Sequence, residues 1–247
     1  MKKAKVISCP INLIMAYDQS EEERVSYDRS ISSLIDHTRI VQEALRAVLS
    51  TAEAVRQKDP NSSSASYKKL LSLKETDELN TRKKVEQTLA GAQLVSNFAA
   101  SLLSADDLIT EVSSFAEAVS FRLNAMTSED FCLMLNSKEK QSEIFLNGIT
   151  EIIAMAFDAF EKAKSALQNL KSDTVRAVQL TYEVDAMEAQ VDHKQRELDL
   201  KVLRLNVALP CVLLMHETVQ RAEEMVDSIQ RLSSAVRVLA LMRGGLS

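Results

Sequence analysis

Two Glu-x-x-x-Asp pairs in the C-terminal quarter of the chain have the residue types and the spacing that could bind a metal ion. The pairs are Glu188/Asp192 and Glu223/Asp227, and on a helix the two residues of each pair lie about 6 Å apart along the axis. Carboxylate oxygens are the ligands that hard cations prefer, among them Mg, Mn and Fe ions. The alternative is an ordinary charged helix face, because Glu and Asp four residues apart are common on helices.

The two pairs are mirror images of each other about a point between residues 207 and 208. Pro210 lies just beyond this point, and proline is typical of the first turn of a helix. If two antiparallel helices meet at a turn near residues 206–210, each Glu of one pair lies level with the Asp of the other. The spacing therefore predicts a helical hairpin that gathers four carboxylates at one place.

The three histidines, His37, His193 and His216, are isolated in the sequence. Neither the Glu-x-x-His motif of di-iron carboxylate proteins nor the histidine spacing of a zinc site is present. We therefore expect each histidine to lie at the surface or to be half-buried. The sequence also lacks a glycine-rich phosphate-binding loop, a nucleophile elbow and a local cysteine–histidine motif, so we expect no catalytic residues and no enzyme activity.

The composition favours long helices over any sheet. Only 4 glycines and 3 prolines occur in 247 residues, aromatic residues make up 4% of the chain, and tryptophan is absent. Residues that favour turns and strands are too scarce for a sheet protein. The net charge of −5, with Lys and Arg dispersed along the chain, argues against nucleic-acid binding.

Cysteine usage and hydropathy indicate a cytoplasmic protein. Cys9, Cys132 and Cys211 are odd in number and far apart in the sequence, which is typical of reduced, packed thiols. A proline interrupts the apolar N-terminal stretch and acids follow it in place of a cleavage site, so residues 1–25 are interpreted as an arm and not as a signal peptide. Residues 88–105, which belong to the longest charge-free stretch, contain Gln, Asn and several serines, which makes this stretch a poor membrane span.

Apolar residues recur at helical spacing between a few breaks in the pattern. Turn-forming residues at 59–64 indicate a loop, and Ser104, followed by two aspartates, resembles an N-cap with acids in the first turn. Asp173 marks another helix start. These signals predict six helices, near residues 26–57, 64–100, 104–126, 137–170, 173–206 and 209–243.

Six such helices make two successive three-helix units, and the expected fold is an all-α antiparallel bundle. The predicted divisions are an N-terminal arm (1–25), a first unit (26–127), a connector containing Phe131 and Cys132 (128–136), a second unit (137–243) and a tail (244–247).

Two segments in the C-terminal third resemble motifs of the PhoU-like phosphate transport regulators. Tyr182–Asp192 is similar to the motif on the middle helix of that family's second unit, and Arg221–Leu232 is similar to the motif on its last helix. The likeness extends more loosely over about residues 26–243, including His37 and the segment Arg82–Leu89. The resemblance implies a bundle of two three-helix units in which Glu/Asp-x-x-x-Asp motifs bind iron or another metal.

By this resemblance the metal ligands are Glu188, Asp192, Glu223 and Asp227, with Fe, Mn or Mg as the candidate cofactor. The first half departs from the family pattern. The acids within residues 73–79 are not in a Glu-x-x-x-Asp register, and the pair at 107 and 111 lies at a predicted helix start, where acids also serve as N-terminal charges. A metal site in the first unit is therefore not expected.

The resemblance further implies a non-catalytic regulator of phosphate uptake that binds a protein partner, either a phosphate transporter or a sensor kinase. Such a protein would be cytoplasmic, and both peripheral contact with the inner face of the membrane and a homo-oligomeric state are compatible with that role. The rival interpretation is a metal-free helical adaptor or scaffold unrelated to phosphate. A di-metal carboxylate enzyme is the third interpretation, and the lack of histidine ligands disfavours it.

Overall fold

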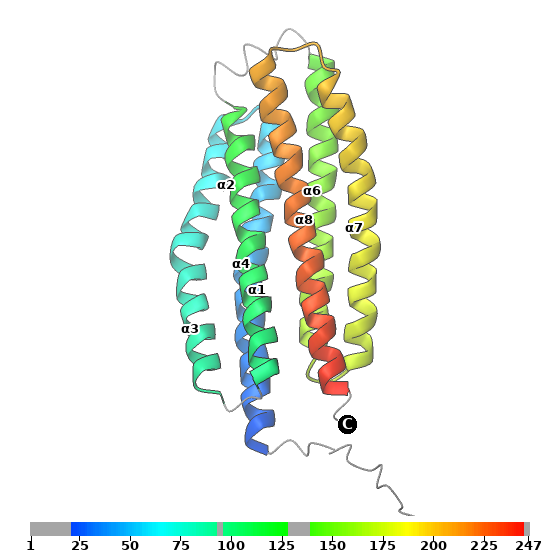
Figure 1. Cartoon of the computed structure of the whole chain (residues 1–247). Coiled ribbons are helices and arrows are strands. Elements are labelled where there is room, and N and C mark those ends of the chain that lie inside the picture. The colour runs from blue at the N-terminus through cyan, green and yellow to red at the C-terminus, as the bar shows by residue number, and fades with distance from the viewer. Residues whose placement is uncertain (1–20, 93–95, 128–138, 245–247) are drawn as a thin grey trace, which may run out of the picture.

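Within the part of the chain that the structure describes, six long helices run side by side in an antiparallel bundle (Figure 1). The structure is a computed structural model, and it describes residues 21–92, 96–127 and 139–244. In chain order the helices are α1 (Glu21–Arg56), one continuous helix made of α2 (Pro60–Ser72), η1 (Leu73–Glu78) and α3 (Leu79–Ala90), then α4 (Ser96–Ala125), α6 (Glu139–Asn169), α7 (Thr174–Leu203) and α8 (Leu209–Gly244). No strand occurs within the described ranges, which confirms the predicted all-α bundle.

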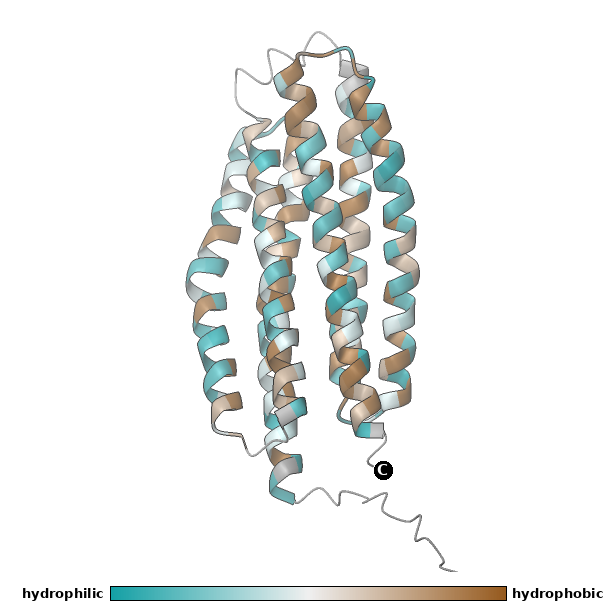
Figure 2. Cartoon of the chain, in the orientation of Figure 1, coloured by the Kyte–Doolittle hydropathy of each residue, from teal (hydrophilic) through white to brown (hydrophobic). Residues whose placement is uncertain are grey.

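The helices follow the order of the two predicted units, and the two units share one core. Helix α1 packs against α6 and helix α4 packs against α8, so both helix pairs join the first unit to the second. The buried apolar side chains form one continuous cluster that draws on every helix. Polar and apolar residues alternate along each helix in Figure 2, as expected for helices that bury one face.

Several predictions fall outside the described ranges. Most of the arm and the whole of the connector, with Cys9, Phe131 and Cys132, belong there. Cys211 is described, and it is buried as expected for a packed thiol. None of the described helices contains an apolar stretch long enough to cross a bilayer.

Helix α2 begins earlier than the sequence indicates. The predicted loop at 59–64 is wrong, because its residues form a helix cap and the first helical turn. The side chain of Asp59 accepts hydrogen bonds from the backbone N–H groups of Asn61 (3.0 Å) and Ser62 (3.1 Å). Pro60 occupies the first turn, where its missing N–H costs no hydrogen bond.

The boundary between the second and third long helices is also corrected. The predicted helices 64–100 and 104–126 are wrong at this boundary, because α3 ends at Ala90 and α4 already begins at Ser96. Ser104 is therefore no N-cap, and Asp106 and Asp107 lie inside α4. Each of these two aspartates pairs with a cation on another helix, so they are not the N-terminal charges that the sequence suggested.

A π-helical segment, Leu73–Glu78, interrupts the second long helix. A π turn inserts extra backbone into a helix and changes the direction of the side chains that follow, and such turns are frequent at functional sites. Glu78, the last residue of this segment, is only 4% exposed, whereas Glu75 and Asp77 in the same segment are exposed. The π segment thus ends on a buried carboxylate.

Helices α6 and α7 approach closely where Gly148 faces Leu198. A Cβ atom at residue 148 would lie 2.7 Å from Leu198 Cδ1. We expect Gly148→Val to lower the free energy of unfolding by about 1–3 kcal/mol, because overpacking a core contact costs this much. Gly148→Ala should cost less, since alanine gains about 1 kcal/mol over glycine in a helix. Urea denaturation of both variants measures this, and a Gly148→Val protein as stable as wild type would contradict the close approach.

Candidate functional site

Helices α7 and α8 form the predicted hairpin, and two hydrogen bonds between them define its register. Gln230 Nε2 donates to Asp185 Oδ1 at 3.0 Å, and His216 Nδ1 is hydrogen-bonded to Asp199 Oδ1. The turn occupies residues 204–208, slightly before the predicted position. The proline at 210 lies in the first turn of α8, as predicted.

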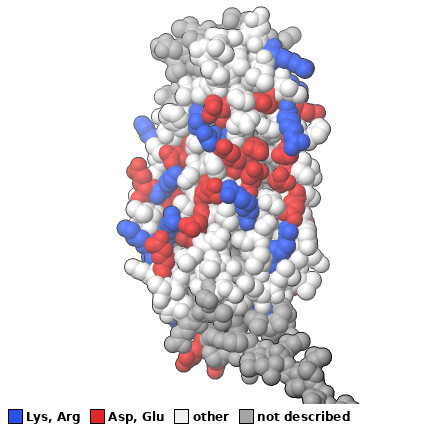
Figure 3. All heavy atoms as spheres, viewed as in Figure 1, with Lys and Arg blue, Asp and Glu red and all other residues white. Residues whose placement is uncertain are grey.

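This register brings the four predicted carboxylates together. Glu188 lies three residues after Asp185 on α7, and Asp227 lies three residues before Gln230 on α8. Glu188 is therefore level with Asp227. Four residues further along, Asp192 lies level with Glu223. All four side chains are half-buried. Acidic side chains gather across the middle of the face seen in Figure 3, with basic side chains around them.

Burial and mutual repulsion raise the pKa of three of these carboxyl groups. Burial contributes most at Glu188, and the charges of Asp192 and Asp227 add to it. Burial is also the main cause at Glu223 and at Asp227, and the charge of Asp192 raises both pKa values further. The four groups therefore oppose one another when ionised, and a cation bound between them would reverse this effect.

Two arginines neutralise part of this charge. Arg196 pairs with Asp192 one turn away on α7. Arg231 lowers the pKa of Asp227, although its guanidinium also pairs with Glu111 of α4 at 2.8 Å. Among the described residues, no group of three or more His, Cys, Asp or Glu side chains stands in ligand geometry, so a metal would require these side chains to turn toward it.

A second polar cluster, which the sequence analysis missed, lies buried in the first unit. We call it the His37 cluster: His37 of α1, Glu78 of the π segment and Asp106 of α4. His37 Nδ1 lies 2.7 Å from Asp106 Oδ1, and His37 Nε2 lies 3.9 Å from Glu78 Oε1. All three residues are buried, so the expectation of a surface or half-buried His37 is wrong. Two carboxylates from other helices compensate this histidine for its loss of water.

The His37 cluster behaves as a buried ion-pair network. Burial lowers the pKa of His37, but the hydrogen bond with Asp106 and the nearby Glu78 outweigh burial and raise it above 6.5. Ser113 donates a hydrogen bond to Glu78, and Arg82 Nε lies 3.8 Å from Asp106 Oδ2. His37 Nε2 and Arg82 Nε have no hydrogen-bond partner among the described residues. The two carboxylates thus have cations of the protein itself beside them.

The other two histidines match their expectations. His193 is exposed on α7, and its nearest acid is Glu197, one turn away at 3.8 Å. His216 is half-buried and serves as the hydrogen-bond partner of Asp199. One sequence signal could have separated His37 from these two. His37 lies between Leu34 and Val41 at the apolar spacing of α1, a position that normally faces the core.

The fold and the site together define an all-α protein of two three-helix units, with a cluster of carboxylates on the last hairpin. No family model and no curated protein sequence matches the chain. Two solved structures are similar to it, one of a PhoU-like protein from Shewanella oneidensis MR-1 and one, from the same organism, named for a PhoU-like role in phosphate regulation. In each comparison the TM-score is 0.70 and the identity 15%, over 86% of this chain and 99% of the other. At this identity the likeness shows the fold, which is that of a PhoU-like helical bundle.

Proposed function

We propose that this protein is a non-catalytic regulator of phosphate uptake that binds a phosphate transporter or its signalling partner. The observation that carries the proposal is the bundle that it shares, over nearly the full length of the other chain, with two PhoU-like structures. One of these is named as a phosphate regulatory protein. The test is phosphate uptake in cells that lack the protein. Unchanged uptake, together with no co-purification of a transporter or sensor kinase, would contradict this role.

Exposed leucines around the turn between α7 and α8 support a protein-binding role. Leu203, Leu209 and Leu213 are each more than half exposed. Grouped apolar side chains at a surface are typical of contact sites. Figure 2 shows this apolar character at the start of α8. Such a contact would place the protein in the cytoplasm, at the inner face of the membrane, when the partner is a transporter.

The second part of the proposal is a bound metal at Glu188, Asp192, Glu223 and Asp227. The donors are all carboxylate oxygens, which suits Fe, Mn or Mg and not a soft metal. The raised pKa values of Glu188, Glu223 and Asp227 support it, because burial and the charges of neighbouring carboxylates disfavour their ionised forms, and a nearby cation would offset both causes. A bound cation would supply that charge and tie α7 to α8.

The double substitution Asp192→Asn plus Asp227→Asn tests the metal. We expect added Fe, Mn or Mg to raise the melting temperature of the wild type, because a ligand that binds only the folded state stabilises it. The double variant should lose this response and its metal content. In metal-free buffer the same variant should be about 0.5 kcal/mol more stable than wild type, since two repelling charges are removed.

A matched control removes the same charge elsewhere. Asp77 and Asp158 are exposed and form no ion pair within the described part of the chain, so Asp77→Asn plus Asp158→Asn should keep the metal response. A wild-type melt that no divalent ion changes would favour the second candidate, a metal-free helical adaptor. The Asp192–Arg196 ion pair favours that candidate, because it already neutralises one of the four proposed ligands.

A further inference from the structure

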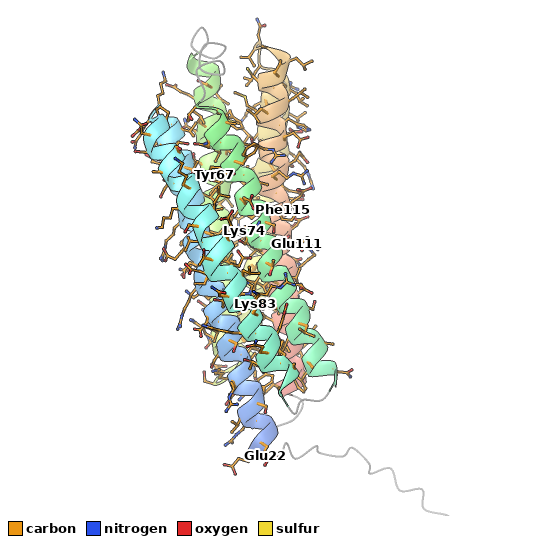
Figure 4. All side chains as sticks on the ribbon, turned by 90° about the vertical axis from the view of Figure 1, so that its left-hand side faces the viewer. Glu22, Tyr67, Lys74, Lys83, Glu111 and Phe115 are labelled. Atoms are coloured by element: carbon orange, nitrogen blue, oxygen red, sulfur yellow. The ribbon has the colours of Figure 1, made fainter. Side chains whose placement is uncertain are left out.

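A cationic groove lies between the first half of α1 and the last turns of α3, far along the chain from the proposed metal ligands. Helices α1 and α3 pack together, and Figure 4 shows them side by side, with Lys83 on α3 and Glu22 at the start of α1. The groove has a volume of about 450 Å³. Its lining is Ser26, Arg29, Ser33, Lys84, Gln87, Thr88, Gly91 and Ala92, which includes two cations and no carboxylate.

The groove presents several donors that the protein itself does not use. Within the described part of the chain, no ion pair or hydrogen bond engages the side chains of Arg29, Lys84, Gln87 or Ser26. Most other arginines of the described helices pair with acids, as Arg82 does with Asp107 at 2.7 Å. In a chain with a net charge of −5, a groove lined by unpaired cations creates a local positive potential that attracts anions.

The hydroxyl groups at the centre of the groove fix the relative level of its two cations. Ser33 Oγ and Thr88 Oγ1 lie 3.4 Å apart across the groove, so these two residues are level. Lys84 precedes Thr88 by one turn on α3, and Arg29 precedes Ser33 by one turn on α1. Because the two helices are antiparallel, these two cations lie on opposite sides of the level that Ser33 and Thr88 share. Their backbones are therefore separated by about 12 Å along the groove. The long side chains of Arg29 and Lys84 can each reach toward the centre of the groove and contact an anion bound between them.

We propose that this groove binds a soluble phosphate-class oxyanion, with a diphosphate fitting it better than a single phosphate. Guanidinium, ammonium, amide and hydroxyl donors are the groups that recognise phosphate oxygens, and arginine does so through two parallel hydrogen bonds. The separation of Arg29 and Lys84 favours an anion with two charged groups, and the volume of the groove exceeds that of a single phosphate. The site depends on neither the proposed metal nor the proposed protein partner.

Calorimetric titration of the metal-free protein with inorganic phosphate and with pyrophosphate tests this site. We expect pyrophosphate to bind more tightly than phosphate. The double variant Arg29→Gln plus Lys84→Gln should weaken pyrophosphate binding about tenfold or more, because two charge-assisted contacts are removed. Both residues are exposed, so the variant should fold, and its melting temperature without ligand checks this.

The matched control is Lys68→Gln plus Lys69→Gln on α2. Both lysines are exposed and have no ion pair among the described residues, so this variant removes the same charge away from the groove. It should bind pyrophosphate within about twofold of the wild type. The proposal is overturned if neither anion binds the wild type, or if both double variants lose binding equally. The second outcome would mean that overall charge attracts the anion.

Discussion

Replacing Asp106 with leucine should lower the free energy of unfolding by about 3–5 kcal/mol, because the change leaves a buried imidazolium without its hydrogen-bonded partner. His37 would retain only Glu78, whose nearest oxygen lies 3.9 Å away. Asp106→Asn should cost less, since an amide oxygen still accepts the hydrogen bond from Nδ1. Urea denaturation below pH 6.5, where the histidine is protonated in both the folded and the unfolded state, measures the loss.

The neighbouring residue provides the control. The side chain of Asp107 is 67% exposed, whereas that of Asp106 is 2% exposed, and Asp107 pairs with Arg82 at the surface. Asp107→Leu should therefore cost less than about 1 kcal/mol, as is usual for an exposed ion pair. If the two substitutions destabilise the protein equally, the buried pair contributes no more than a surface pair, and the ion-pair interpretation of the His37 cluster fails.

The parts of the fold that could be predicted from sequence are those set by local periodicity. In α7 the apolar residues at 177, 184, 191 and 198 recur every seven residues, which is a helical spacing, and all four are buried. The hairpin register could also be predicted, because one short turn joins two straight helices and level positions then follow from residue numbers alone. The observed hydrogen bond between Asp185 and Gln230 fits that count.

Tertiary interactions account for what could not be predicted. Asp106 and Asp107 looked like first-turn acids because their partners, His37 and Arg82, are distant in the sequence and unknown before folding. The π segment could not be predicted from the sequence either. Nothing in residues 73–78 marks a change of helical pitch, and the segment ends at Glu78, which accepts a hydrogen bond from Ser113 on another helix. These are the places where contacts between helices outweighed local preference.

The two units differ in the positive charge that lies beside their partly or fully buried carboxylates. In the first unit, Glu78 and Asp106 lie beside His37, and Arg82 adds a second cation near Asp106. In the second unit, the arginines that offset the charge of the four proposed metal ligands, Arg196 and Arg231, are exposed, and the pKa values of three of the four remain raised. The first unit therefore compensates its buried carboxylates with its own cations, whereas the second unit compensates its four proposed ligands only in part. This asymmetry explains why we propose a metal in the second unit alone.

The charge on His37 should make the stability of the protein depend on pH. Its pKa in the folded protein is raised above the unfolded value of 6.5, so the folded state binds the proton more tightly. The ion pairs of the His37 cluster are then fully present below pH 6.5, and their contribution is lost as the pH rises through the folded pKa. One proton changes the free energy of unfolding by at most about 1.4 kcal/mol per pH unit in that window.

Comparison of the wild type with His37→Gln isolates this effect, because glutamine can hydrogen-bond to Asp106 but carries no charge. We expect the stability difference between the two proteins to shrink steadily as the pH rises above 6.5 in urea denaturation series. His193→Gln, which alters an exposed histidine, should follow the wild-type profile. The raised carboxyl pKa values of the second unit are shared by all three proteins and cancel in the comparison. A constant difference between wild type and His37→Gln from pH 6 to pH 9 would mean that folding does not change the pKa of His37. A wild type that gains stability relative to His37→Gln as the pH rises would mean that the histidine is a neutral hydrogen-bond donor in the core, because only the unfolded state would then take up the proton.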